Sequence, residues 1–149
     1  MLTKRIRTFL SLDRHTVLLF IEAFLFLGLA KLQLLRTFAK VAPKLGSKTE
    51  ETSLQCDDKH IQTLKRVRSA ISVMSRHTFW DSKCLVQAMA GMKMLERRDI
   101  PSTLYLGTAR DENGKLIAHA WLRSGSLYVS GSEVMNKFVV VEKFAKHAN

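Results

Sequence analysis

The run CLVQAMAGMKMLERRDIPSTLYLGT, residues 84–108, is the most informative about the fold, because a helical pattern changes to a strand pattern within it. Residues 84–98 predict a helix that Asp81 or Ser82 would cap. After Pro101, the segment STLYLGT is rich in residues that favour β-strands. The chain is therefore expected to pass from a helical part to a sheet near Pro101.

Segments on the C-terminal side of this run predict an antiparallel sheet. Asn113-Gly114 is a strong signal for a two-residue hairpin, and KLIAHAWLR, residues 115–123, follows it as the second strand. Ser124-Gly125 allows another turn before the strand SLYVS, residues 126–130. FVVVEKF, residues 138–144, is a fourth strand or a final apolar segment. Helices followed by an antiparallel sheet make an α+β domain.

The N-terminal third differs in composition from the rest, so we divide the chain into three parts. Residues 1–45 are a basic, apolar helical segment, residues 46–56 are a linker, and residues 57–149 are the α+β domain. Near the start of that domain, Asp57 or Asp58 would cap a helix. One face of this helix is apolar and consists of Ile61, Leu64, Val67, Ile71 and Met74.

The most hydrophobic stretch, TVLLFIEAFLFLGLAKLQLL at residues 16–35, allows three interpretations. As a signal peptide, it lacks a small-residue cleavage site after Ala30. As a transmembrane helix it is nearly long enough, but Glu22 lies inside it and basic residues flank both ends. As an amphipathic helix with a narrow polar stripe, it would pack into a core, against a partner or on a membrane surface.

Charge and cysteine content indicate the environment of the protein. The 149 residues carry a formal charge of +11, and nine basic but only two acidic side chains lie in residues 1–48. This balance favours an acidic protein or an anionic membrane surface as partner, whereas no helix-turn-helix, zinc-finger or aromatic-basic signature supports binding of nucleic acid. Two cysteines are too few for a disulfide framework, so we expect the cytoplasm, with contact to the inner face of the membrane as an alternative. No spacing suggests a metal site.

Cys84 and His119 are the candidate catalytic pair. Cys84 falls in the first turn of the helix predicted over residues 84–98, where unpaired backbone N–H groups favour a thiolate and can hold an oxyanion. His119 lies mid-strand in AHAW, and a neutral imidazole beside a thiol can take its proton and pass it to a leaving amine. The competing interpretation is a small core cysteine and a structural histidine. Cys56, beside Asp57 and Asp58, is a poor thiolate candidate.

The run at residues 84–108 together with AHAWLRSGSLYVSG, residues 118–131, resembles the protease component of lasso-peptide biosynthesis, a split B protein. The resemblance covers roughly residues 57–135. It implies that residues 57–149 are a transglutaminase- or papain-like cysteine peptidase core that needs no cofactor, with Cys84 as nucleophile and His119 as base. It also implies thiolate attack at the leader–core bond of a ribosomally made precursor peptide, a step in the maturation of an antibiotic. The implied partners are that precursor, a separate leader-recognition protein and the ATP-dependent lactam synthetase.

The third catalytic group departs from this family. Members often carry an Asp on the strand after the histidine, but this chain has LYVSG there, so Ser130, a backbone carbonyl or Glu133 would orient His119. A dyad still works because a thiol is intrinsically nucleophilic. Two alternatives stay open: a transglutaminase-like acyltransferase and a non-catalytic, membrane-associated binding module. If a partner presents the leader, a chain starting near Gly46 should express better but cleave poorly.

Overall fold

The helices precede most of the strands along the chain. The computed structural model describes residues 2–149. The helices are α1 (Leu2–Leu10), α2 (Arg14–Gln33), α3 (Phe38–Val41), α4 (Asp58–Ser75) and α5 (Cys84–Glu96), with 3₁₀ turns η1 (Ala42–Leu45) and η2 (Met135–Lys137). The strands are β1 (Ser47–Lys48), β2 (Ser102–Arg110), β3 (Leu116–Ser124), β4 (Leu127–Ser130) and β5 (Val139–Lys146). The predicted α+β class is confirmed.

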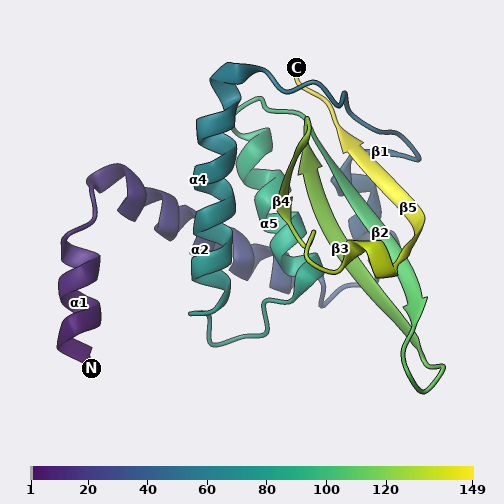
Figure 1. Cartoon of the computed structure of the whole chain (residues 1–149), viewed down its shortest axis with the longest axis horizontal. Coiled ribbons are helices and arrows are strands. Elements are labelled where there is room, and N and C mark those ends of the chain that lie inside the picture. The colour runs from purple at the N-terminus through teal and green to yellow at the C-terminus, as the bar shows by residue number, and fades with distance from the viewer. Residues whose placement is uncertain (1) are drawn as a thin grey trace.

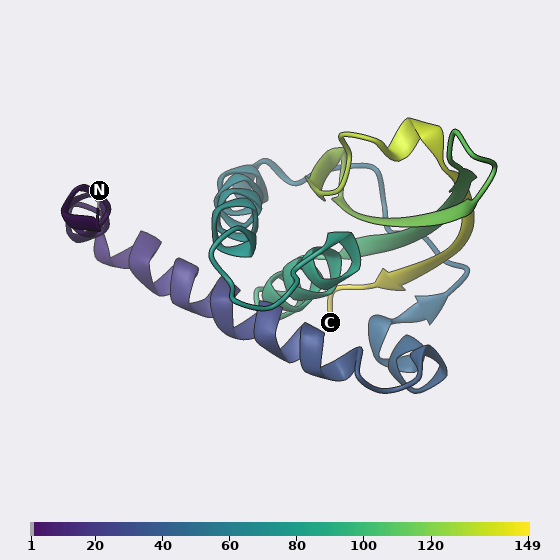
Figure 2. The same ribbon diagram turned by 90° about the horizontal axis from the view of Figure 1, so that it is seen from below.

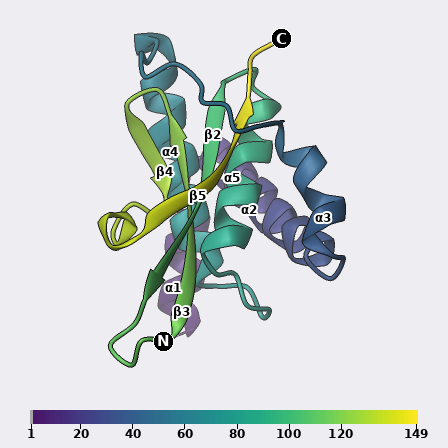
Figure 3. The same ribbon diagram turned by 90° about the vertical axis from the view of Figure 1, so that its right-hand side faces the viewer.

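The strands form one antiparallel sheet in the order β1-β5-β2-β3-β4. Strands β2 and β3 make the expected hairpin, in which Gly107 lies opposite His119. The pairing of β5 with β2 shifts between Leu106 and Gly107, and Val141 is the extra residue on β5. Such a bulge bends the strand and redirects the side chain that it leaves unpaired. Figure 3 shows the sheet with β5 in front and the β2–β3 hairpin projecting below it.

Helix α5 is the middle layer of the molecule. It contacts α2 and α4 on one side and β2, β3 and β4 on the other (Figures 1 and 2). Gly91 favours the close approach of α5 to the sheet, because a Cβ there would lie 2.8 Å from Leu122 Cδ2 and the Leu122 side chain would have to shift. The largest fully buried side chains come from all three layers: Leu27, Leu64, Val67, Ile71, Met94, Leu95, Leu104, Leu122 and Phe144.

Helix α2 packs one face against α4 and α5. Ala23, Leu27 and Ala30 are buried in the core that the sheet shares. Glu22, which the sequence left without a partner, accepts two hydrogen bonds of 2.7 Å from the guanidinium of Arg98, and the hydrogen bonds raise the pKa of Arg98. By length and apolar composition alone, α2 also satisfies the criteria for a helix that crosses a membrane.

The segment over residues 46–56, expected to be a linker, crosses the sheet and is attached to it. Its residues Ser47 and Lys48 form β1 beside the end of β5. Thr52 is buried, and its backbone N–H donates a 2.9 Å hydrogen bond to Thr103 Oγ1. The domain boundaries themselves remain a prediction, but this segment helps to cover the face of the sheet opposite α5.

Candidate active site

Cys84 is the first residue of α5, at an N-terminus without a side-chain cap. The prediction that Asp81 or Ser82 caps this helix is wrong, because the N-cap position is occupied by Lys83, whose side chain accepts no hydrogen bond there. The hydroxyl of Ser82 lies 2.8 Å from Thr78 Oγ1, and Asp81 pairs instead with the Lys83 ammonium at 3.3 Å. The first backbone N–H groups of α5 therefore have no side-chain acceptor at the N-cap, and a developing oxyanion is the ligand that such groups favour.

His119 is oriented by a backbone carbonyl. Its Nε2 lies 2.7 Å from the carbonyl oxygen of Gly131. Since a carbonyl only accepts, Nε2 is assigned as the N–H donor, and Nδ1 of the neutral ring is then the free acceptor. A general base needs such an unprotonated nitrogen. The ring also packs against Trp121 at 5.9 Å and Phe138 at 5.0 Å between centroids.

Ser130 and Glu133 are the two side chains that were expected to orient His119 in place of an aspartate. Ser130 Oγ is buried and has no hydrogen-bond partner among the described residues, and Glu133 is exposed. Within residues 2–149, neither side chain contacts His119 through a hydrogen bond, whereas the carbonyl of Gly131 does. Gly131 adopts a φ of 77°, and a Cβ there would lie 2.4 Å from the carbonyl oxygen of Ala120. Glycine is therefore required at the point where the acceptor for His119 is presented.

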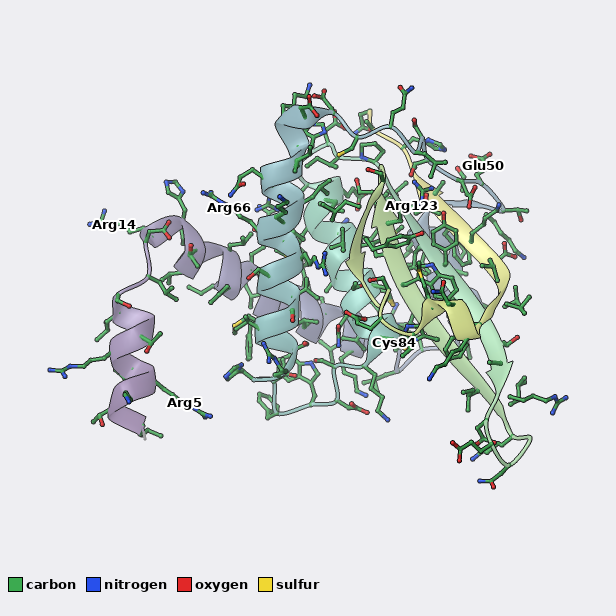
Figure 4. All side chains as sticks on the ribbon, in the orientation of Figure 1. Arg5, Arg14, Glu50, Arg66, Cys84 and Arg123 are labelled. Carbon is green, nitrogen blue, oxygen red and sulfur yellow. The ribbon has the colours of Figure 1, made fainter. Side chains whose placement is uncertain are left out.

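Cys84 and His119 line one cavity of about 280 Å³ between the start of α5 and the sheet. Figure 4 shows Cys84 at the end of α5 beside the sheet. Most of the wall is apolar, and it includes Phe38, Leu85, Leu106, Ala118, Ala120 and Val141, the last being the bulged residue of β5. The cavity can therefore accept a short peptide segment with an apolar side chain beside the thiol.

The two side chains approach this cavity from different directions. Side chains alternate along a strand, and Ala120 and Leu122 belong to the core under α5, so His119 and Trp121 belong to the opposite face of β3. Among the described residues, no hydrogen bond joins the Cys84 thiol to the His119 ring. Catalytic hydrogen bonds are often longer in the free enzyme and shorten with substrate bound. The structure thus brings the two residues to one cavity without forming their contact.

A stack of aromatic rings supports His119 from behind. Trp121 lies between His119 and Tyr105, and its ring is stacked on Tyr105 at 5.5 Å. Arg123 Nε donates to the Tyr105 hydroxyl at 2.8 Å, and that hydroxyl donates to Glu51 at 2.8 Å. Burial raises the pKa of Tyr105, the bond from Arg123 opposes this rise and the bond to Glu51 adds to it. The sequence analysis did not predict this network. Its signal in the sequence is the alternation in AHAWLR, which places His119, Trp121 and Arg123 on one face of the strand.

The second cysteine lies outside the cavity. Cys56 packs against Gly125, and its thiol donates weakly to the carbonyl of Asp57 at 3.7 Å. Both cysteines are free. In the part of the chain that the structure describes, no group of three His, Cys, Asp or Glu side chains is arranged to hold a metal ion.

Comparison with protein families gives one match. A model described as the transglutaminase-like superfamily matches residues 27–143, which include α3, α4, α5, the whole sheet except the end of β5, and the C-terminal part of α2. Cys84 and His119 both lie inside the matched range. No curated protein and no solved structure matches the chain.

Proposed function

The chain belongs to the transglutaminase-like superfamily, which includes cysteine peptidases and acyltransferases, and from this premise we propose that it hydrolyses one peptide bond through a thioester on Cys84. The observation that carries the proposal is a thiol at the uncapped N-terminus of α5, in the cavity that His119 also lines. Cys84 also packs against the hydrophobic core, so a cysteine that only fills the core is the competing explanation.

The proposed reaction has two steps. Because the His119 ring lies on the face of β3 opposite α5, the mechanism requires that substrate binding bring the ring and the Cys84 thiol into contact. Cys84 then transfers its proton to Nδ1 of His119 and attacks the carbonyl carbon, while the backbone N–H groups that begin α5 hold the oxyanion. The C–N bond then breaks, and His119 returns the proton to the leaving amine. In the second step His119 deprotonates a water molecule, which attacks the thioester and releases the carboxylate and the thiol. The hydrogen bond from Nε2 to Gly131 stabilises the ring in the tautomer that both steps need.

The proposed substrate is the leader–core junction of a lasso-peptide precursor. The support is the resemblance over residues 84–108 and 118–131, and a cavity of a size that suits a few residues rather than a folded domain. Because the cavity is small, recognition of the leader is assigned to a separate protein, and the amine released by cleavage would be the substrate of the lactam synthetase.

An acyltransferase is the second candidate because the superfamily includes such enzymes and because its first step is the same. The difference lies in the group that attacks the thioester, which is an amine instead of water. Purified full-length protein should be incubated with the precursor and the leader-recognition protein, with and without an added primary amine. The products should be identified by mass spectrometry.

Hydrolysis predicts a core peptide with a free amine and a leader with a free carboxylate, whether or not amine is added. A leader that carries the added amine would instead establish acyl transfer. If the precursor stays unchanged and Cys84 reacts with iodoacetamide no faster than Cys56 does, both enzymatic functions are excluded. The protein would then be a non-catalytic binding module.

A further inference from the structure

Helix α2 presents an apolar stripe to solvent on the side that does not pack. The leucine stripe consists of five residues that fall within an arc of about 80° at 3.6 residues per turn, namely Leu18, Ile21, Leu25, Leu29 and Leu32. Leu25 and Leu32, for example, are 58% and 61% exposed. A contiguous exposed patch of this kind marks an interaction site.

Cationic side chains are concentrated on α1, the helix that precedes α2. Helix α1, which projects from the rest of the molecule, exposes Leu2, Ile6 and Leu10 on one side and carries Lys4, Arg5 and Arg7 on the others (Figure 1). Figure 4 shows Arg14 extending away from the fold at this end, whereas Arg5 points to the side of α1 that faces the rest of the molecule. Both acidic side chains of residues 1–48 are engaged, since Glu22 pairs with Arg98 and Asp13 accepts hydrogen bonds from Thr16.

A hollow beside α1 repeats this combination. It has a volume of about 670 Å³ and lies between α1, α2 and α4. Leu12, Val73 and Met74 give it an apolar floor, and Lys4 and Arg5 stand on its wall. An apolar floor with a cationic wall complements an anionic amphiphile, in which a negative headgroup is joined to a hydrocarbon chain.

We propose that the leucine stripe and α1 bind the surface of an anionic lipid bilayer, with α2 lying in the plane of the interface. Charge complementarity selects this occupant: α1 has an apolar side flanked by Lys and Arg, which is the pattern of interfacial helices, and the leucine stripe of α2 adds apolar area beside it. Crossing the bilayer is incompatible with the fold, because Ala23, Leu27 and Ala30 are packed in the core and Glu22 is paired with Arg98.

This orientation leaves the active site accessible. The leucine stripe lies on the side of α2 away from α4 and α5, and the sheet lies beyond α5 (Figure 2). The cavity with Cys84 is between α5 and the sheet, so membrane binding would place it away from the lipid. The inference does not depend on the chemistry of Cys84, and the Cys84→Ala protein should bind vesicles like the wild type.

Flotation of the full-length protein with vesicles tests the proposal. We expect binding to vesicles that contain phosphatidylglycerol, weaker binding at high salt, and little binding to phosphatidylcholine alone. Leu25→Gln with Leu32→Gln should reduce partitioning about tenfold or more, because two exposed leucines no longer enter the interface. The matched control, Leu54→Gln with Leu116→Gln, removes two leucines that are equally exposed elsewhere and should bind normally. Urea unfolding of each variant checks that the fold is intact.

Four results would overturn the proposal. Equal binding to neutral and anionic vesicles, or undiminished binding by the leucine-stripe variant, would show that charge or the stripe has no part. Resistance to carbonate extraction would show that α2 spans the membrane. The protein could also fail to bind vesicles and instead form a dimer, or bind the leader-recognition protein, through the leucine stripe. Either result would show that a protein surface covers the stripe.

Discussion

At the level of single residues, the contribution of the His119 ring nitrogens to cleavage can be tested separately from the contribution of the ring's stacking to stability. His119→Phe keeps a flat ring between Trp121 and Phe138 but removes both nitrogens. If the imidazole is the base, cleavage should fall by about 10²–10⁴-fold while thermal unfolding changes little. Steady-state cleavage and circular dichroism of the same preparations provide the comparison. Near-normal cleavage by this variant would mean that His119 only stacks, as its position on the face opposite α5 would then suggest.

Gly131 offers a second test at this scale. Gly131→Ala forces a Cβ toward the carbonyl of Ala120 and should displace the carbonyl that orients His119. Gly114→Ala is the matched control, since its φ is also 77° but its Cβ would meet nothing within 4 Å. Both variants carry the cost of a left-handed alanine, about 1–2 kcal/mol. We expect cleavage to fall much further in Gly131→Ala than in the control when both are assayed well below their unfolding temperatures; equal losses would exclude orientation through Gly131.

The sequence identifies functional residues whose chemistry depends on the side chain, but not those that act through the backbone. Cys84 and His119 were singled out because thiol and imidazole chemistry is tied to the residue type. A backbone carbonyl was one of the three expected orienting groups, but Gly131 could not be named, because any residue has a carbonyl and only the backbone path shows which one meets His119. Ser130 and Glu133 were chosen for their side chains, and neither contacts His119 through a hydrogen bond among the described residues.

At the scale of elements, the ion pair between α2 and the end of α5 should stabilise the packing of the two helices. Glu22→Gln leaves Arg98 without its carboxylate at a site where the Glu22 side chain is only 15% exposed. We expect a loss of about 1–3 kcal/mol in the free energy of unfolding in urea. The control Lys93→Gln removes an exposed pair with Glu96 and should cost roughly 0.2–1 kcal/mol. Equal effects would show that Glu22 contributes no more than a surface charge.

The elements themselves were largely readable from the sequence. Asn113-Gly114 marks the hairpin between β2 and β3, and Asp57 caps α4 as expected. The N-terminus of α5 was predicted wrongly, because the Ser82 hydroxyl forms a hydrogen bond with the Thr78 hydroxyl instead of capping the helix. This contact depends on the loop geometry, which the sequence does not show. The strand order was not predicted, since β5 lies between β1 and β2 through pairings of residues 96 or 98 positions apart with β1 and 31 to 44 positions apart with β2.

At the scale of the whole molecule, α2 is part of the core. The sequence led us to expect that a chain starting near Gly46 would express better than the full-length chain, but that chain would lose Ala23, Leu27, Ala30, Val41 and Leu45 from the core. We now expect it to unfold without cooperativity or to aggregate, whereas a chain starting at Ser11, which lacks only α1, should keep a cooperative urea transition. A cooperative transition in the shorter chain would show that residues 46–149 fold alone.

The central claim is that the Cys84 thiol carries out peptide-bond hydrolysis. The most direct measurement is the cleavage rate of the precursor, followed by mass spectrometry with the leader-recognition protein present, for wild type, Cys84→Ala and Cys56→Ala. Both cysteines are partly exposed, so neither change should disrupt the core severely. We predict no cleavage by Cys84→Ala and a normal rate for Cys56→Ala. Cleavage by Cys84→Ala at the wild-type rate would contradict the central claim.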